Sequence, residues 1–273
     1  MFIATKHERR PLRPAAESAA RPRPDRPGGS PAADPCAGRE DGAGGAGGAA
    51  PAACLDTLFA RYTGRSHSIK LARKEVVYSE GQTDQNIYFI EFGQVKAVVS
   101  SPSGRSCLLS IRTAGDCVGE LGLLHPCRRE TVTTMKPTRL RCVPIADFRA
   151  ALVSEGCADE FLCYLLGQIS AQQAMIANMV TMNSEQRLAA TILELAAKIG
   201  TPRGDSTYIN GRITQEELSA MVGTTRSRVG LFLKRFKASG MIAEAGFSVA
   251  VDEEKLRRYL QDSAWLVKEH SQY

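Results

Sequence analysis

The chain has 273 residues, of which 43% are hydrophobic, and a formal net charge of +6 at pH 7. This length allows two domains with sizeable cores, and the small positive charge permits nucleic-acid binding without arguing for it. The chain has no apolar run long enough to cross a membrane, no signal-peptide core and no C-x-x-C pair among its eight scattered cysteines. We therefore expect a cytoplasmic protein with reduced thiols, no membrane partner and no bound metal.

Residues 1–53 are rich in proline, arginine, alanine and glycine, and they end in G-A-G-G-A-G-G-A-A-P-A-A. Such a segment cannot bury enough apolar surface to offset the entropy lost on ordering. It is predicted to be a disordered tail.

Residues 54–157 are predicted to form a β-barrel that senses a signal. A short helix is expected at 54–62, and the segment from Ser68 to Phe148 reads as all-β. Its strand-like runs fall at 76–78, 87–90, 95–99, 107–111 and 140–143, with glycine-containing turns between them. Short, regularly spaced strands of this kind are typical of a sandwich or barrel.

Within this barrel, residues 118–132 read V-G-E-L-G-L-L-H-P-C-R-R-E-T-V. Backbone amides at the start of a short helix can bind an anion, arginine can clamp a phosphate, and glutamate can accept hydrogen bonds from sugar hydroxyls. The combination suits a phosphorylated ribose ligand. The alternative is a charged loop in which Glu120 pairs with an arginine.

Residues 158–183 are predicted to form a dimerisation helix. Apolar residues recur at alternating steps of three and four, as in a two-stranded coiled coil. The series consists of Leu162, Leu165, Ile169, Ile176 and Met179, with amides at Gln172 and Asn183. A homodimer is therefore expected, although the same helix could instead pack on its own barrel.

Residues 184–273 are predicted to form a winged helix-turn-helix that binds DNA. After a helix from Glu185 to Ile199, Thr214 and Glu217 have the spacing of a capping box. Gly223 should end that helix, and Thr224 or Thr225 should cap the next one. This next helix would enter the major groove. A hairpin at 241–251 would be the wing, and a helix at 252–260 would close the domain.

The basic residues of the second helix support this reading. Residues in the first turn of a recognition helix meet base edges, and arginine can grip guanine through O6 and N7. Arg226 and Arg228 lie in that turn, whereas Lys234 lies further along, where phosphate contacts are expected. An ordinary solvated basic face is the alternative.

The order of these parts resembles the Crp–Fnr family of bacterial transcription regulators. The matching motifs are G-E-L-G-L in the barrel and V-G-T-T-R-S-R-V-G in the helix-turn-helix, together with E-G-Q-T-D-Q-N-I-Y-F-I-E-F-G-Q-V-K from Glu80, S-P-S-G-R from Ser101 and Q-R-L-A from Gln186. The resemblance covers about Ile69 to Leu260. It implies an α+β fold with an N-terminal jelly-roll β-barrel of the cyclic-nucleotide-binding type, a long dimerisation helix and a C-terminal winged helix-turn-helix. It also implies a DNA-binding regulator rather than an enzyme, with promoter DNA, a second copy and RNA polymerase as partners.

Carried over by position, the resemblance assigns DNA contacts to Thr214, Thr225, Arg226, Ser227 and Arg228. Two positions depart from the best-known members of the family. Ser227 stands where they have glutamate, and Leu231 stands where they have an arginine. The operator sequence therefore does not follow from the resemblance.

The ligand cassette departs as well. Gly119, Glu120 and Leu121 match the family, but the gap to the arginine is shorter and the arginine–hydroxyl pair is missing. The implied ligand contacts are Gly119, Glu120, Leu121, Arg128 or Arg129, Thr131 after a register shift, and Gln172 and Gln173 at the base. Cyclic AMP or cyclic GMP is the candidate ligand, although a carboxylate at Glu130 would repel its phosphate. The alternative is a constitutive DNA-binding or architectural protein whose barrel is a dimer scaffold.

Overall fold

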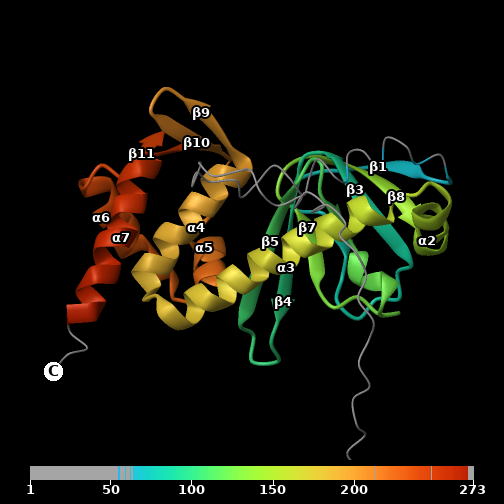
Figure 1. The fold of residues 1–273 in the computed structure, drawn as a ribbon, viewed down its shortest axis with the longest axis horizontal. Helices are drawn as coiled ribbons and strands as arrows, with labels where there is room; N and C mark the ends of the chain where they lie inside the picture. The colour runs from blue at the N-terminus through green and yellow to red at the C-terminus, as the bar shows by residue number, and fades with distance from the viewer. Residues whose placement is uncertain are drawn as a thin grey trace, which may run out of the picture. The chain divides into compact units, whose positions relative to one another are not determined.

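The computed structural model describes Leu55, Phe59, Tyr62 and residues 64–211, 213–246 and 248–269, the last seven of them by backbone only (Figure 1). The predicted tail at 1–53 lies outside the described residues. So does most of the predicted helix at 54–62, of which Leu55 and Phe59 are helical and buried.

The N-terminal half is a β-barrel made of two four-stranded antiparallel sheets, with strand orders β1-β8-β3-β6 and β2-β7-β4-β5. The strands are β1 (His67–Leu71), β2 (Val76–Tyr78), β3 (Asn86–Phe92), β4 (Gln94–Ser100), β5 (Ser106–Thr113), β6 (Cys117–Val118), β7 (Thr131–Thr134) and β8 (Thr138–Pro144). All five predicted runs lie within strands. The predicted fold class is confirmed.

Three parts of the barrel differ from the prediction. Strands β1, β6 and β7 were not expected, because each is short or mostly polar. The reading of 68–148 as all-β is wrong at its end, where α2 (Ile145–Ser154) begins. Ile145 and Phe148 are three residues apart, so a helix places both against the core, where each is buried. A short 3₁₀ helix, η1 (Glu120–Leu123), also interrupts the strands.

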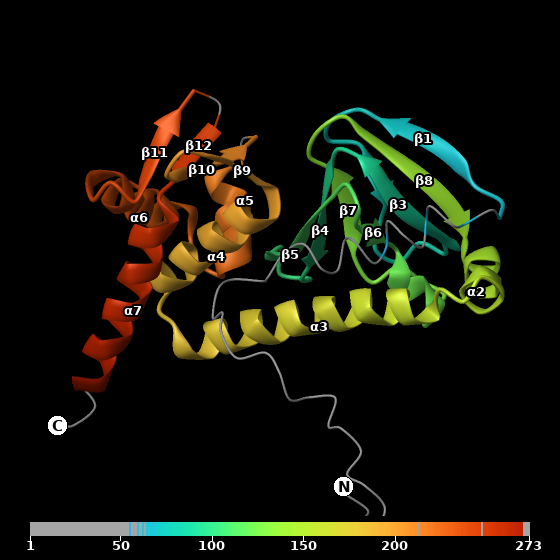
Figure 2. The same cartoon turned by 45° about the horizontal axis from the view of Figure 1, so that its top comes forward.

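The long helix α3 (Ala158–Thr181) runs along one side of the barrel, and the chain then turns into α4 (Ser184–Ile199) (Figure 2). Phe161 and Tyr164 anchor α3 to the barrel core. The side chain of Asn183 caps α4 and forms a capping box with Gln186. The boundary between the predicted helices at 158–183 and 185–199 therefore has a local chemical cause.

The C-terminal half contains α4, α5 (Gln215–Val222), α6 (Arg226–Ala238) and α7 (Glu253–Glu269), together with a small antiparallel sheet of strand order β11-β12-β10-β9. The hairpin of β11 (Ile242–Ala245) and β12 (Ser248–Val251) is the predicted wing. The strands β9 (Gly200–Arg203) and β10 (Ser206–Asn210) were not predicted, and α7 is longer than the expected helix. Among the described residues, no helix is long and apolar enough to cross a bilayer.

Side chains of the barrel strands β4 and β5 also contact the C-terminal helices. Leu108 and Ile111 of β5 belong to the same hydrophobic cluster as the cores of α4, α5 and α6. Lys96 of β4 forms an ion pair with Glu217 of α5 at 2.7 Å. These contacts make the stability of the helix-turn-helix depend in part on the barrel.

Candidate functional site

The two helices of the helix-turn-helix begin and end where local chemistry dictates. Thr214 caps α5 and forms a capping box with Glu217, so the first orphan amides of the helix are satisfied. Gly223 ends α5 in the left-handed conformation, at φ 69° and ψ 44°. Thr225 then caps α6 by accepting a hydrogen bond from the Arg228 amide at 3.4 Å. The predicted turn between two short helices is therefore present.

The outer face of α6 is basic and open. Its apolar residues Val229, Phe232 and Phe236 are buried in the domain core. All the predicted DNA contacts are exposed side chains, namely Thr214, Thr225, Arg226, Ser227, Arg228 and Lys234. The structure thus brings the five predicted residues of α6 and its cap onto one short helix, with Thr214 at the start of the preceding one.

The five basic side chains of α6 differ in whether they have an ionic partner. Arg235 pairs with Glu185 at 2.9 Å, and Lys237 pairs with Glu244. Within the part of the chain that the structure describes, no ion pair involves Arg226, Arg228 or Lys234. These three cations are free to meet a polyanion, whereas the two paired ones are already engaged.

The barrel cassette surrounds a buried arginine. Gly119 has φ 91° and precedes η1, and a Cβ at this position would lie 2.7 Å from Nη1 of Arg128. Arg128 is only 4% exposed. Its guanidinium donates to the Gly119 carbonyl at 2.9 Å, to the Asn86 carbonyl and to the Asp84 carboxylate at 2.7 Å. Its Nε is buried without a partner.

Several of the expected ligand contacts of this cassette already have partners within the protein. Arg128 is held by the protein's own oxygens rather than left free as a phosphate clamp. Arg129 is exposed. The Thr131 hydroxyl accepts a hydrogen bond from the Glu80 amide at 3.1 Å, so it is engaged by the loop after β2. Arg128 is buried, and Glu130 and Thr131 are half-buried.

A second buried arginine, which was not predicted from the sequence, neighbours Glu120. Arg112 of β5 is 5% exposed and donates to the Tyr164 hydroxyl at 3.1 Å. Its Nη2 lies 3.5 Å from the Glu120 carboxylate. The alternative reading of the cassette, in which Glu120 pairs with an arginine, is therefore realised. The arginine comes from another strand, and the only sequence signal for it was a charge within an apolar run.

The surroundings of Glu130 disfavour the charged form of its carboxyl group. Burial, and then repulsion from the Glu120 carboxylate, raise the pKa of Glu130 above its ordinary value. The Tyr78 hydroxyl donates to Glu130 at 2.9 Å, and burial raises the pKa of that tyrosine as well. The interior of the barrel therefore holds two carboxylates whose charge is only partly offset by Arg112 and Arg128.

The exposed face of α3 is shifted by one residue from the predicted seam. Leu162, Ile169 and Ile176 are exposed, as predicted, at 52%, 49% and 65%. Leu165, by contrast, packs against the core of its own barrel. The free apolar stripe is completed by Leu166 and Val180, which are 54% and 82% exposed, with Gln173 between them. We call these six residues the α3 stripe.

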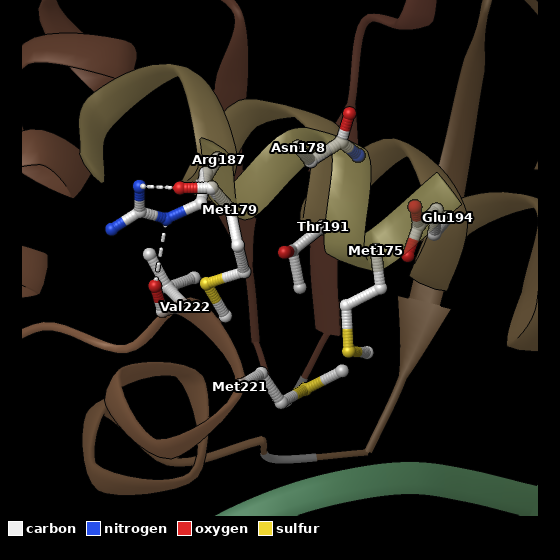
Figure 3. Close-up of a pocket in the computed structure, with 8 residues that line it drawn as sticks. All are labelled: Met175, Asn178, Met179, Arg187, Thr191, Glu194, Met221 and Val222. Carbon is white, nitrogen blue, oxygen red and sulfur yellow. Dashed lines mark hydrogen bonds between the residues drawn. The ribbon is translucent and has the colours of Figure 1, made fainter. Parts of the chain in front are cut away.

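Met179, the last member of the predicted seam, faces its own DNA-binding domain. Figure 3 shows it in a small hollow lined by α3, α4 and α5, together with Met175 and Met221. A Cβ on Gly223, in the turn of the helix-turn-helix, would lie 3.5 Å from the Met179 methyl group. Arg187 links the same elements by donating to the Val222 carbonyl at 2.9 Å. Gln172 is exposed beside the α3 stripe.

Comparison with known proteins gives the same class of protein. Residues 68–155 match the cyclic nucleotide-binding domain, and residues 186–259 match the Crp-like helix-turn-helix domain. The chain is 28% identical over 205 residues to the CRP-like cAMP-activated global transcriptional regulator of Mycobacterium tuberculosis, covering 74% of this chain and 92% of the relative. It is 23% identical over 202 residues to the cAMP-activated global transcriptional regulator CRP of Escherichia coli, covering 72% and 94%.

Solved structures agree with this fold. A CRP-family transcriptional regulator from Thermus thermophilus superposes with a TM-score of 0.61 at 26% identity, covering 71% of this chain and 96% of the other. The c-di-GMP-responsive global regulator CLP of Xanthomonas campestris gives a TM-score of 0.61 at 18% identity, covering 72% and 98%.

The barrel, the long helix and the basic winged helix-turn-helix define a DNA-binding transcription regulator with a cyclic nucleotide-binding domain, and the relatives named above are transcription regulators rather than enzymes. The chain belongs to the Crp–Fnr family of transcription regulators.

Proposed function

We propose that this regulator binds an inverted repeat in promoter DNA as a homodimer, with α6 of each protomer in a major groove. The observation that carries the proposal is the open basic face of α6, where Arg226, Arg228 and Lys234 have no counter-ion among the described residues. Two recognition helices related by a dimer axis meet successive major grooves about 34 Å apart, so the two half-sites should be one helical turn apart.

The positions on α6 suggest different roles. Arg226 begins the helix, so it can reach a base edge and grip a guanine, while Thr225, Ser227 and Arg228 flank it. Lys234 lies two turns further on and suits a phosphate. Thr214 caps the neighbouring helix and suits the DNA backbone. We also propose that the regulator works in the cytoplasm and contacts RNA polymerase at the same promoter.

The dimer is proposed to form through the α3 stripe. Its residues repeat at alternating steps of four and three along the exposed side of α3, which is the spacing of a two-stranded coiled coil. On the opposite side of the helix, Phe161 and Tyr164 are fixed to the barrel. One face of α3 is thus used within the protomer, and the other is left for a partner.

For the barrel we propose an anionic ligand that meets Gly119 and Glu120, with cyclic AMP and cyclic GMP as the first candidates. The relatives' names point to nucleotides, namely cyclic AMP for the M. tuberculosis regulator and c-di-GMP for CLP. The unpartnered Nε of the buried Arg128 supports a hydrogen-bond acceptor nearby. A phosphate would have to compete with Asp84 for the rest of that guanidinium, and it would be repelled by Glu130.

The second candidate is a constitutive DNA-binding protein whose barrel is a scaffold. The observation in its favour is that Asp84 and two backbone carbonyls already engage the Arg128 guanidinium. Calorimetry with cyclic AMP and cyclic GMP separates the two candidates. Binding that is lost in Arg128→Ala while circular dichroism shows an intact fold supports the ligand site, and the absence of binding together with full DNA affinity supports the scaffold.

The DNA proposal is tested by selecting random duplexes with wild type, Arg226→Ala and Lys234→Ala, and by titrating affinity against salt. Losing a bidentate guanine contact should cost about 1–3 kcal/mol per half-site and relax preference at one base pair. Losing Lys234 should weaken all sequences alike and lower the salt slope by about one unit. If Arg226→Ala keeps the wild-type preference at every position, α6 does not read the DNA as proposed.

A further inference from the structure

The recognition helix carries one large apolar side chain on its outer face. Leu231 is 49% exposed, whereas the other large apolar residues of α6 are buried or partly buried in the domain core. An exposed leucine alone needs no explanation. This one, however, lies in the middle of the face proposed to meet DNA.

Helix geometry places Leu231 among the DNA-facing residues. Side chains three and four positions apart share a helix face, so Leu231 neighbours Ser227 and Arg228 on one side and Lys234 on the other. All three of these neighbours are exposed. Leu231 lies about 7.5 Å along the helix axis from Arg226, because each residue rises about 1.5 Å. It can therefore reach a base pair different from the one that Arg226 meets.

A leucine in the major groove has only one favourable contact with a base edge. It cannot pair with the N7, O6, O4, N6 or N4 groups, and covering them would remove their water without replacement. Thymine is the standard base that presents a methyl group, at C5, in this groove. We propose that Leu231 packs on the C5-methyl group of a thymine in each half-site and so fixes thymine at that position. The proposal rests on DNA binding by α6.

The test removes only the methyl group. On the operator selected by the wild-type protein, each thymine is replaced in turn by uracil, which keeps every hydrogen-bonding group. Affinity is then measured for wild type, Leu231→Ala and Leu231→Met. One uracil position per half-site should weaken wild type about fourfold, the factor that corresponds to one buried methyl-sized group. The same replacement should leave the DNA affinity of Leu231→Ala unchanged. Leu231→Met should still lose most of the fourfold affinity that wild type loses.

One control variant and three possible outcomes make the test decisive. Leu124→Ala removes a leucine that is 75% exposed on the barrel, and it should keep the wild-type response to uracil. If replacing thymine by uracil changes the affinity of Leu231→Ala as much as that of wild type at every position, the inference is wrong even though the protein binds DNA. If wild type selects no sequence at all, the proposed function itself fails, and the two failures are thereby distinguished. The inference is also overturned if Leu231→Ala lowers the affinity, relative to wild type, by the same factor on thymine DNA and on uracil DNA at every position.

Discussion

Replacing Leu166 and Val180 together by glutamate should convert the regulator from a dimer to a monomer. In the single protomer these side chains are 54% and 82% exposed, so neither contributes much to the fold of the isolated chain. Full burial of such a side chain is worth about 1.5–3 kcal/mol. The exposed fractions therefore leave about 1–2 kcal/mol per residue to be gained on dimerisation.

The free energy gained on burying two residues in each of two protomers sums to about 4–8 kcal/mol, which corresponds to a factor of about 10³ to 10⁶ in the dimer dissociation constant. The buried glutamates would add repulsion and desolvation to this loss. Sedimentation velocity over a concentration series measures the effect, and circular dichroism should show unchanged helix content. The loss of dimer should also lower DNA affinity.

Two variants control this experiment. Val153 has the same 82% exposure as Val180 but lies on α2, so Val153→Glu should leave the dimer intact. Leu165→Ala should lower the unfolding midpoint, because Leu165 packs against its own barrel, while leaving the dimer constant nearly unchanged. If Leu166→Glu/Val180→Glu remains a dimer at wild-type concentrations and Leu165→Ala dissociates, the partner meets the other face of α3.

Three further predictions concern stability. Burial raises the pKa of Glu217, but hydrogen bonds from Lys96 and Thr214 outweigh it and lower that pKa below 4.5. The stability from this carboxylate is therefore present above pH 4.5 and lost as pH falls through the folded pKa, so the Tm deficit of Glu217→Gln should shrink on acidification. Burial, and then repulsion from Glu120, raise the pKa of Glu130 above 4.5. The contribution of this residue to the free energy of unfolding is therefore fully present below pH 4.5 and is lost as pH rises through the folded pKa. Glu130→Gln should therefore melt above wild type at about pH 7 and lose that advantage near pH 4. Finally, Arg128→Met should cost about 3–5 kcal/mol in urea unfolding, because it leaves the Asp84 carboxylate unpaired, whereas Arg129→Met on the exposed side should change stability by less than about 0.5 kcal/mol.

The helix-turn-helix was predictable from the sequence because its determinants are local. A capping box joins residues three apart, and a left-handed glycine acts on its own backbone, so Thr214, Glu217 and Gly223 carry their meaning without the rest of the fold. The strand runs followed from apolar period and glycine turns in the same way. Short or mostly polar strands such as β7 and β9 carry no such signal, because their pairing partner decides whether they form at all.

The sequence by itself determined that α3 has an apolar seam, but not which one. Leu165 and Leu166 are adjacent and lie three and four residues after Leu162, so both satisfy a heptad. Only the packing of Phe161 and Tyr164 on the barrel turns Leu165 inward and leaves Leu166 free. The same holds for the arginines of the cassette. Arg128 and Arg129 are equivalent in the sequence, and the tertiary structure alone separates them, because Asp84, 44 residues away, pairs with Arg128 in the interior.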